Sequence, residues 1–507
     1  MTLYHGRNSL QDNKDLTITK KDEVYAKIVG ERHITMEISE YFTFFVPGYQ
    51  FVPAFRNRLW DGKIRLFNLQ TSQIYLGLIP YLKEFCVERG YTYDLEELED
   101  EYSVYHAEKF FDTLNLHSQG NAIKVRDHQR NAFIHTMQRR RALLLSPTAS
   151  GKSLIIYLIF RQLLQYQNLK GLIIVPTTSL VEQLYSDFQD YSSHNGFDVE
   201  ENVHRIYQGK DKVSDKKLII STWQSLYQLP KEYFQDFEYI IGDEAHLFKA
   251  QSLTTILTSA TNTKYRVGLT GTLDGTKTHK LVLEGLFGAV EKVTTTKELI
   301  DTNQLSPFEI KCLVLKHSPE IAESMKGCTY QEEIEYLILN ENRNRFIRNL
   351  AISLNTNTLV LFQMVEKHGK ILFEIIKEKA NGRKVFFVHG KVDTDDREAI
   401  RKIMETENDA IVVASFGTFS TGINIRNLHN IIFASPSKSR VRNLQSIGRG
   451  LRQSAGKKMA TLYDIADDLR HKKHMNFTLQ HFVERVKIYN EEKFPFKIYN
   501  IGLKNGN

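Results

Sequence analysis

A strand-like leucine run is followed by a segment whose residue types suit phosphate binding. The segment is Ser146-Pro-Thr-Ala-Ser-Gly-Lys-Ser153, between the apolar run Leu143–Leu145 and the helical pattern Leu154–Tyr166. In a strand, loop and helix of this kind, backbone N–H groups point at phosphate oxygens, a lysine adds positive charge and a hydroxyl ligates magnesium. The spacing predicts an ATP site in which Lys152 contacts the β and γ phosphates and Ser153 ligates Mg²⁺.

The same loop supplies the other residues that we expect to line the nucleotide, Thr148, Ala149, Ser150 and Gly151. Ser146 stands where loops of this type usually carry glycine. Taken alone, a Gly-Lys-Ser sequence on a surface turn that binds nothing is therefore the alternative interpretation.

Two adjacent carboxylates weaken that alternative. The segment Tyr239-Ile-Ile-Gly-Asp243-Glu244-Ala-His246 places them at the end of an apolar run. Asp243 can hold the magnesium ion and Glu244 can polarise the attacking water, the two functions that phosphoryl transfer to water requires. An Asp-Glu pair that caps a helix is the alternative. Because a phosphate loop lies upstream, we favour the catalytic interpretation.

Positive charge for the γ-phosphate is available further along the chain, in Gln445-Ser-Ile-Gly-Arg449-Gly-Leu-Arg452. Arginines three residues apart on a helix share one face, so we expect Arg449 and Arg452 to act together, with Gln445 beside them. A solvated basic helix face is the alternative. Upstream of the phosphate loop, Arg126 and Gln129 are candidates for contacts to the nucleotide, because a glutamine amide can pair with both edges of adenine.

The elements that must position these residues follow a regular rhythm. From Leu143 onward, short apolar runs alternate with longer helical patterns, which is typical of a parallel sheet covered by helices. The first group of runs is Leu143–Leu145, Leu172–Val175, Leu218–Ser221, Tyr239–Ile241 and Val267–Leu269. The second group, after a charged stretch, is Thr358–Phe362, Lys384–Val388, Ala410–Ala414, Asn430–Phe433 and Met459–Tyr463. We predict an α/β protein with two parallel-sheet domains in tandem.

The two ends of the chain differ from this rhythm. Residues 1–118 are aromatic-rich and predict a small α+β domain, with a strand at His33–Ile38 and a helix at Pro80–Arg89. The acidic stretch Leu95–Glu101 is its expected linker, with a solvated turn as the alternative. We place the following domains at residues 119–295 and 296–470. Residues 471–507 should form a C-terminal helical extension, with a helix near Phe477–Asn490 that packs on the second α/β domain or, alternatively, contacts DNA.

Composition sets broad limits. The 507 residues suffice for about three compact units, and 41% hydrophobic with 25% charged residues is typical of folded globular proteins. The net charge of +7 fits a polyanionic partner without requiring one. Three cysteines are too few for a disulfide framework or a zinc site, which favours a reducing cytoplasm. No run has the length or apolarity of a signal peptide or membrane span, so we expect neither.

In this order the motifs resemble helicase superfamily 2, from about residue 120 to residue 470. Asp243-Glu244-Ala245-His246 resembles its DEAH box, and the loop before Lys152 resembles its Walker A segment. Two segments resemble those that grip the nucleic-acid backbone, namely Pro176-Thr177-Thr178 and Thr222-Trp223-Gln224. Thr270-Gly271-Thr272 resembles the tripeptide that couples hydrolysis to strand movement, although Ser-Ala-Thr is commoner there.

The second domain carries the rest of the resemblance. Ser415 and Thr418 resemble a backbone-binding segment, which continues into the nucleotide-binding Gly422 and Asn424, and His389-Gly390 falls where another backbone contact is expected. The resemblance implies two tandem RecA-like domains. Each threonine segment alone would be interpreted as a strand end or a helix cap. Five such segments in the right order favour phosphate contacts, which position a strand without reading its bases.

Over nearly its whole length the chain resembles a narrower family, the UvsW recombination and repair helicases of tailed bacteriophages. Its N-terminal resemblance lies in Tyr49–Arg65. This segment interleaves aromatic and basic residues, a mixture that suits neutralisation of a DNA backbone and stacking of bases. The candidate DNA-binding residues are Arg56, Arg58, Lys63 and Arg65. Alternatively, the aromatic rings form the small domain's own core under a solvated charged face, and Trp60 is expected to be structural.

The resemblance implies an ATP-dependent DNA helicase or translocase, moving 3′ to 5′, that acts on branched DNA in phage recombination, repair and replication. Branch migration of junctions, fork regression and unwinding of D-loops or R-loops are the activities implied. ATP and Mg²⁺ would bind between the two α/β domains. We expect branched or forked DNA as partner, an RNA–DNA hybrid as a second one, a monomer, and the host-cell cytoplasm. The alternatives are an RNA-directed helicase and an ATP-gated nucleic-acid clamp that never separates strands.

Overall fold

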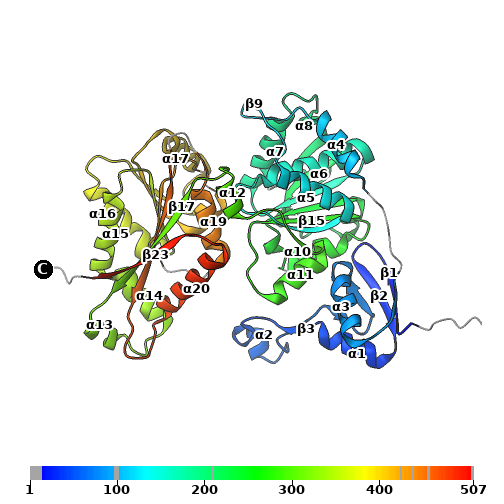
Figure 1. The fold of residues 1–507 in the computed structure, drawn as a ribbon, viewed down its shortest axis with the longest axis horizontal. Coiled ribbons are helices and arrows are strands. Elements are labelled where there is room, and N and C mark those ends of the chain that lie inside the picture. The colour runs from blue at the N-terminus through cyan, green and yellow to red at the C-terminus, as the bar shows by residue number, and fades with distance from the viewer. Residues whose placement is uncertain are drawn as a thin grey trace, which may run out of the picture. The chain divides into compact units, whose positions relative to one another are not determined.

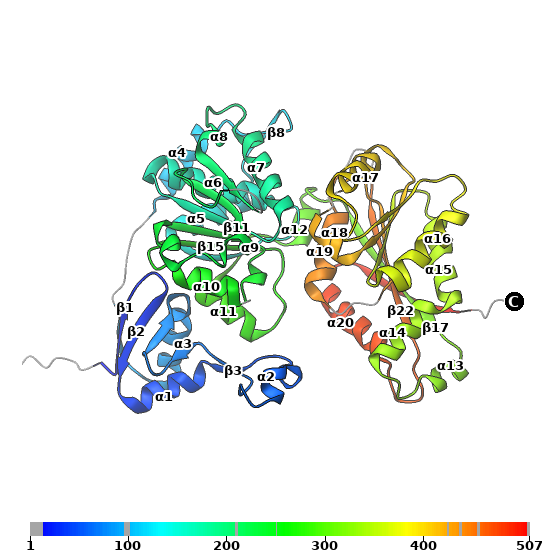
Figure 2. The ribbon, with the colours of Figure 1, turned by 180° about the vertical axis from the view of Figure 1, so that it is seen from behind.

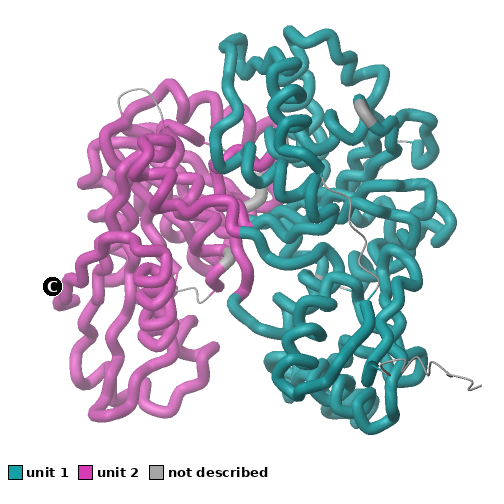
Figure 3. The backbone as a smooth tube through the Cα atoms, turned by 45° about the vertical axis from the view of Figure 1, so that its right-hand side comes forward, with its two compact units in different colours: residues 1–144, 153–270, 275–291 teal, residues 145–152, 271–274, 292–507 magenta. Residues whose placement is uncertain are grey.

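The computed structural model describes residues 14–95, 102–207, 211–249, 251–422, 425–435, 439–453 and 457–503. Of the expected linker Leu95–Glu101, only Leu95 lies within them. Figure 3 shows two compact units. The first contains residues 1–144, 153–270 and 275–291, and the second contains residues 145–152, 271–274 and 292–507.

The N-terminal region is a mixed five-stranded sheet with two helices beside it (Figures 1 and 2). The strand order is β5-β6-β2-β1-β7, with β1 antiparallel to β2 and parallel to β7. The strands are β1 (Leu16–Lys20), β2 (Tyr25–Gly30), β5 (Phe67–Asn68), β6 (Gln73–Tyr75) and β7 (Tyr93–Leu95). The two helices are α1 (Arg32–Tyr41) and α3 (Ile79–Arg89), and the short 3₁₀ turn η2 (Leu76–Leu78) precedes α3. The predicted α+β region and its helix at Pro80–Arg89 are confirmed.

The strand predicted at His33–Ile38 is wrong, because these residues lie inside helix α1. Apolar residues at positions 34, 36 and 38 suggested an alternating strand. In the structure Ile34 and Ile38 are buried on one face of the helix, whereas Met36 is 52% exposed. The spacing of four residues, and not that of two, matches the packed surface.

Between α1 and β5 the chain forms a projection, here called the arm (residues 43–65). Its elements are β3 (Thr43–Phe45), η1 (Tyr49–Phe51), α2 (Pro53–Arg56) and β4 (Lys63–Arg65). Strands β3 and β4 pair antiparallel, and in both ribbon views the arm extends away from the five-stranded sheet (Figures 1 and 2).

Polar and close contacts fix the N-terminal region to the rest of the first unit. The Tyr81 hydroxyl donates to Glu284 Oε2 at 2.6 Å, on helix α11 (Lys277–Phe287). A Cβ added at Gly77 would lie 1.9 Å from the Glu284 carbonyl oxygen, so only glycine allows this approach. Arg141 pairs with Glu23. The elements η2 and α3 of the N-terminal region therefore pack on α11, the helix that follows Thr270-Gly271-Thr272 in the chain.

The first unit contains a parallel sheet in the order β12-β13-β11-β14-β15-β10-β16. Its strands are β10 (Arg141–Leu145), β11 (Gly171–Val175), β12 (Val203–Ile206), β13 (Leu218–Thr222), β14 (Tyr239–Asp243), β15 (Tyr265–Thr270) and β16 (Val290–Lys292). The accompanying elements are α4 (Val104–Thr113), β8 (His117–Ser118), β9 (Asn121–Ala122), α5 (Asp127–Arg139), α6 (Lys152–Gln167), α7 (Thr178–Ser192), α8 (Val199–Asn202), α9 (Trp223–Leu226), η3 (Lys231–Asp236), η4 (Ala245–Lys249) and α10 (Gln251–Ser259). All five predicted strands of this group are present.

The second unit contains a parallel sheet in the order β19-β20-β18-β21-β22-β17-β23. Its strands are β17 (Phe308–Lys316), β18 (Thr358–Phe362), β19 (Val385–Val388), β20 (Ile411–Ser415), β21 (Asn430–Phe433), β22 (Ala460–Asp468) and β23 (Phe496–Gly502). The helices are α12 (Thr296–Asp301), α13 (Pro319–Ser324), α14 (Tyr330–Leu339), α15 (Glu341–Ser353), the π-helix η5 (Val365–Gly369), α16 (Lys370–Lys379), α17 (Thr394–Thr406), α18 (Phe416–Gly422), α19 (Arg440–Gly450) and α20 (Phe477–Glu491).

Alternate residues of β18 enter different cores. Leu359 and Leu361 belong to one buried cluster, and Val360 and Phe362 to another. A sheet buried on both faces gives continuous apolar runs, which is why the sequence displayed these strands clearly. The predicted fold class, two parallel-sheet α/β domains after a small α+β region, is confirmed.

The C-terminal segment packs as favoured, since Leu479, Phe482 and Tyr489 of α20 enter the core of the second unit. The segment is helical only in part, because β23 pairs with β17 and completes the sheet. Most residues of β23 are exposed, because it is an edge strand. Its sequence therefore lacks the continuous apolar run that marks the other strands.

Candidate active site

The strand order of the first sheet brings three predicted segments together. Strands β14, β15 and β10 are neighbours, and they end at Asp243, Thr270 and Leu145 respectively. The carboxyl ends of parallel strands share one edge of the sheet, which is where open α/β sheets bind ligands. The carboxylate pair, the Thr-Gly-Thr segment and the phosphate loop all follow strands at this edge.

Serine hydroxyls close the phosphate loop. Ser146 Oγ lies 2.6 Å from Ser150 Oγ, which donates to the Pro147 carbonyl oxygen at 2.7 Å. Ser146 and Ser150 are fully buried. Ala149 and Gly151 take left-handed φ angles of +68° and +84°. The serine that replaces glycine thus supplies a hydroxyl that fastens the loop.

The Thr-Gly-Thr segment lies against this loop. A Cβ built on Gly271 would lie 3.5 Å from Lys152 Nζ and 3.6 Å from the Ser146 carbonyl oxygen. On its other side, Thr270 Oγ1 lies 3.0 Å from His246 Nδ1. The segment therefore contacts both the predicted phosphate-binding lysine and the Asp-Glu-Ala-His motif.

The carboxylate pair has a strained local geometry. The backbone N–H of Glu244 donates to Asp243 Oδ1 at 2.9 Å, and Glu244 has a left-handed φ of +50°. Such a conformation is uncommon for a residue other than glycine and is often found at functional sites. His246 Nδ1 lies 3.3 Å from Glu244 Oε2 as well as near Thr270. His246 is a positioning residue that we missed, although the motif Asp-Glu-Ala-His contained it.

Ser153 has a hydrogen-bond partner that the sequence did not predict. Its Oγ lies 2.9 Å from the hydroxyl of Tyr191, on α7. Burial, and then the nearby Asp187, raise the pKa of Tyr191, so the phenol stays protonated. Because a serine oxygen has two lone pairs, Ser153 can keep this partner and still ligate a cation.

Gln129 and Arg126 lie at the start of α5. Arg126 is the N-cap residue, and its backbone N–H donates to Gln129 Oε1 at 3.0 Å. Gln129 is only 2% exposed. It is therefore not an ordinary residue of the helix surface, and its amide is held at the helix start.

The prediction that Arg449 and Arg452 share a helix is wrong, because α19 ends at Gly450 and Arg452 lies beyond it. The Lys457 ammonium donates to the carbonyl oxygens of Gly450 at 2.5 Å and Arg452 at 2.8 Å, which holds the chain where it turns away from the helix. Burial lowers the pKa of Lys457 to about 7.

Helix α19 nevertheless lies close to the phosphate loop, and both belong to the second unit. A Cβ on Gly448 would lie 2.6 Å from Thr148 Cβ, so glycine is required for this approach. Gln445 and Arg449 are therefore carried by a helix that contacts the loop.

The segments predicted to grip nucleic acid in the first sheet follow the neighbouring strands β11 and β13. Gln224 Nε2 donates to the Pro176 carbonyl oxygen at 3.5 Å, which joins the two segments. Thr177 Oγ1 accepts from the Leu180 N–H at 3.3 Å and caps α7, while Thr222 Oγ1 lies 3.0 Å from Ser225 Oγ. Thr178 and Trp223 begin the helices α7 and α9.

In the second sheet the corresponding segments follow β19 and β20, which are also neighbours. Ser415 Oγ lies 2.8 Å from Thr418 Oγ1. The Gly390 carbonyl oxygen accepts from Arg397 at 2.9 Å, and His389 Nδ1 accepts from the Lys391 N–H at 3.3 Å. Gly422 ends α18, and Asn424 lies outside the described residues.

The other half of that edge carries a buried polar network. Arg343 Nε lies 3.0 Å from both oxygens of Asp467, and His317 Nε2 lies 3.1 Å from Oδ1. His368 bridges Ser435 Oγ at 3.1 Å and Asn344 Oδ1 at 3.2 Å. All these side chains are almost fully buried. We name these six residues the closed network.

The basic residues of the arm have different local partners. Arg65 pairs with Asp61, and Lys63 Nζ lies 4.9 Å from the centre of the Phe45 ring. Arg56 Nε donates to the Gln50 carbonyl oxygen at 3.2 Å, and Arg58 is exposed. Trp60 Nε1 donates to the Lys63 carbonyl oxygen at 2.9 Å, which fixes the position of the indole ring.

Three family models match successive parts of the chain. The model described as DNA helicase UvsW, N-terminal, matches residues 15–96, and the model described as type III restriction enzyme, res subunit, matches residues 122–275. The helicase conserved C-terminal domain matches residues 341–454.

Similarity to a curated relative extends over almost the whole chain. It is 33% identical to the ATP-dependent DNA helicase uvsW of Enterobacteria phage T4, covering 96% of this chain and 100% of that protein. The chain belongs to the UvsW family of helicases. The crystal structure of T4 UvsW matches with a TM-score of 0.52 and 32% identity, over 97% of this chain and 100% of the other. A second T4 UvsW structure covers 55% of this chain and 99% of its own, with 31% identity and a TM-score of 0.51.

Membership of the UvsW family makes this chain an ATP-driven DNA helicase and confirms the predicted resemblance. Among the described helices, none is long and apolar enough to cross a membrane.

Proposed function

We propose that this UvsW-family helicase acts on branched DNA in phage recombination, repair and replication, by migrating junctions, regressing forks and unwinding D-loops or R-loops. The observation that carries this proposal is the arm, which adds exposed aromatic and basic side chains to a helicase core. Backbone-gripping segments alone do not distinguish a branch from a linear strand. We further propose branched DNA and RNA–DNA hybrids as substrates, a monomeric state and the host-cell cytoplasm.

For the ATP site we propose that Lys152 binds the β and γ phosphates, that Glu244 polarises the attacking water, and that Arg449 and Arg452 neutralise the developing charge. Gln445 would support these arginines. The nucleotide would be lined by Arg126, Gln129, Thr148, Ala149, Ser150, Gly151, Gly422 and Asn424. The proposal is supported by the shared strand edge, the contact of Gly271 with Lys152 and the approach of α19 to Thr148.

Mg²⁺ fits the donor set proposed for it, the Ser153 hydroxyl and the Asp243 carboxylate, because this ion prefers hard oxygen ligands. When bound, it would neutralise phosphate charge. Thr270-Gly271-Thr272 would transmit the state of the site, since it touches Lys152 and His246.

For the DNA groove we propose Pro176, Thr177, Thr178, Thr222, Trp223, Gln224, His389, Gly390, Ser415 and Thr418, with Arg56, Arg58, Lys63 and Arg65 on the arm. We also retain the domain limits 1–118, 119–295, 296–470 and 471–507 as a proposal.

The test is ATP hydrolysis without nucleic acid and with linear duplex, single-stranded DNA, a four-way junction, a fork or RNA, alongside strand displacement. The Glu244→Gln variant, which lacks the carboxylate proposed to polarise water, serves as the inactive control. We expect the strongest stimulation from the junction or fork, and none in this control or in Lys152→Ala. Stimulation by RNA alone would indicate the RNA-directed alternative. Turnover with no strand displacement or branch movement would indicate a clamp.

A further inference from the structure

The arm contains a hollow whose lining combines rings with guanidinium groups. Its volume is about 590 Å³, and it is lined by Phe55, Arg56, Arg58, Leu59, Trp60 and Asp61. A base needs a flat apolar surface, and its phosphate needs a cation. Both are present in one short stretch of chain.

The lining is held in shape by contacts inside the arm. Tyr49 stacks on Phe45 with ring centroids 4.8 Å apart and meets Phe55 edge-on at 4.7 Å. A Cβ on Gly62, which has a φ of +78°, would lie 2.4 Å from the Tyr49 ring. Together with the Trp60 hydrogen bond, these contacts hold the Phe55 and Trp60 rings in place, which lowers the ordering cost of binding.

The rim is apolar and exposed. Leu59, which lines the hollow, is 80% exposed. Between residues 41 and 70 the only acid is Asp61, against the four basic residues Arg56, Arg58, Lys63 and Arg65. Asp61 already pairs with Arg65, so the charge left at the hollow is positive and complements a phosphodiester.

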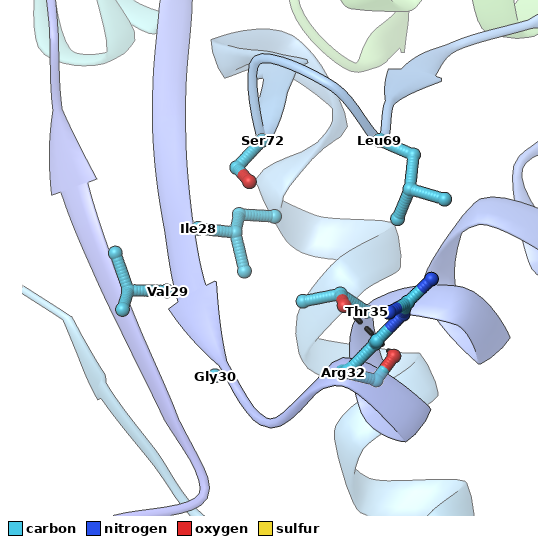
Figure 4. A pocket seen from close by; sticks show the side chains of 7 residues that line it. All are labelled: Ile28, Val29, Gly30, Arg32, Thr35, Leu69 and Ser72. Atoms are coloured by element: carbon cyan, nitrogen blue, oxygen red, sulfur yellow. Dashed lines mark hydrogen bonds between the residues drawn. The ribbon is translucent and has the colours of Figure 1, made fainter.

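A second hollow, of about 410 Å³, lies beside the N-terminal end of α1 (Figure 4). Its lining has the aliphatic side chains Ile28, Val29 and Leu69 and a single charged residue, Arg32. It offers neither a ring surface nor a pair of cations. Of these two hollows, only the one in the arm combines aromatic rings with a pair of arginines.

We propose that the arm hollow receives one unpaired nucleotide at a DNA branch point, with the base against Phe55, Trp60 and Leu59 and the flanking phosphates near Arg56 and Arg58. This inference rests on the proposed action on branched DNA and adds the group that the arm recognises. A perfectly paired duplex presents no base for the hollow, so the arm would favour branches over linear duplex.

The test uses the full chain and forked DNA with 2-aminopurine at the unpaired nucleotide next to the duplex. The charge variant is Arg56→Gln with Arg58→Asn, because asparagine tolerates the φ of +58° at position 58. The wall variant is Leu59→Ser. The matched controls are Lys27→Gln and Val87→Ser, at exposed positions of the N-terminal region away from the arm.

We expect the charge variant to weaken binding of the fork about tenfold and to lower the slope of log Kd against log salt by about two. Leu59→Ser should weaken binding of the fork about fivefold, because it removes an apolar side chain that the base would cover. Both should reduce the 2-aminopurine response, whereas the controls should not. Binding of linear duplex should change less than binding of the fork in each variant.

Equal 2-aminopurine responses in wild type and both arm variants would overturn the inference, as would the same response from a paired probe. If instead the wild type does not prefer a fork or junction in ATP hydrolysis, the proposed function fails. The two results are distinguishable because the first is a local fluorescence signal and the second a rate.

Discussion

The two parallel sheets share one architecture, yet their carboxyl edges hold different chemistry. At the first edge, β14, β15 and β10 end in the Asp243-Glu244 pair, the Thr-Gly-Thr segment and the phosphate loop, with Asp243, Glu244 and Lys152 partly exposed. At the second edge, the ends of β18, β21, β22 and β17 adjoin the closed network, whose members bond to one another.

This difference shows that position at a strand end does not by itself define a ligand site. The side chains of the closed network are desolvated and pair mainly with one another, although Arg343 Nη1 is buried without a partner. At the first edge Ser146, Ser150 and Thr270 are buried as well, but the charged groups of Lys152, Asp243 and Glu244 remain partly exposed to solvent. The partial exposure of these charged groups, and not their position at a strand end, therefore separates the candidate ATP site from the closed network.

The largest expected effect concerns Arg449 on helix α19. Arg449→Gln should lower kcat for ATP hydrolysis by about 10³-fold or more, because an arginine on the γ-phosphate stabilises the transition state. ATP binding, measured with a fluorescent analogue, should change much less. A wild-type kcat would mean that α19 carries no catalytic arginine at this position.

Breaking the closed network should affect stability instead of turnover. Arg343→Met leaves Asp467 buried without its main partner, which should cost about 3–5 kcal/mol in the free energy of unfolding by urea. Adding Asp467→Leu should restore much of the loss, since an apolar pair replaces the ion pair. If the double variant is no more stable than Arg343→Met, the ion pair is not what holds this edge.

The closed network also predicts an acid sensitivity. Burial, and then Arg343, lower the pKa of His368 from 6.5 to about 3, so His368 is neutral when folded. As pH falls from 6.5 towards 3, the unfolded chain takes up a proton that the folded chain refuses, and stability declines. At pH 4.5 this loss should be about 2–3 kcal/mol relative to pH 7.

Urea unfolding at both pH values, with His368→Gln as comparison, checks this. Glutamine cannot titrate but retains polar atoms for Ser435 and Asn344. The variant should lose less stability than the wild type between pH 7 and pH 4.5. An identical loss would assign the acid sensitivity to other groups.

The smallest expected effects are at Thr177 and Thr178, two neighbouring residues that should differ in what their hydroxyls do. Thr177 caps α7, so Thr177→Val should cost about 1 kcal/mol of stability. Thr178 is exposed, so Thr178→Val should leave stability unchanged and raise the KM for DNA about fivefold, as for one lost hydrogen bond. Parallel urea and DNA-stimulated ATPase titrations measure both quantities. If Thr178→Val leaves the KM for DNA unchanged, this hydroxyl does not contact DNA.

Much of the fold and of the candidate ATP site could be predicted from the amino-acid sequence. The phosphate loop, the carboxylate pair and ten of the strands stood out because sheets buried on both faces need unbroken apolar runs. Strand β23 did not, since an exposed edge strand can be polar. The sequence predicts a strand within helix α1 because the apolar residues there fit both a two-residue and a 3.6-residue period. Only the packing of Ile34 and Ile38 in the folded protein distinguishes the two.

The sequence by itself determined the family, the fold class and the residue types of the ATP site, because these depend on local spacing along the chain. Only the tertiary structure revealed His246 beside Glu244 and Thr270, Tyr191 on Ser153, and the end of α19 before Arg452. Likewise, nothing local marks the closed network, whose residues come from elements far apart in the chain. Contacts of this kind form only when the ends of separate strands meet at one edge of a sheet. Patterns of neighbouring residues in the sequence therefore cannot predict them.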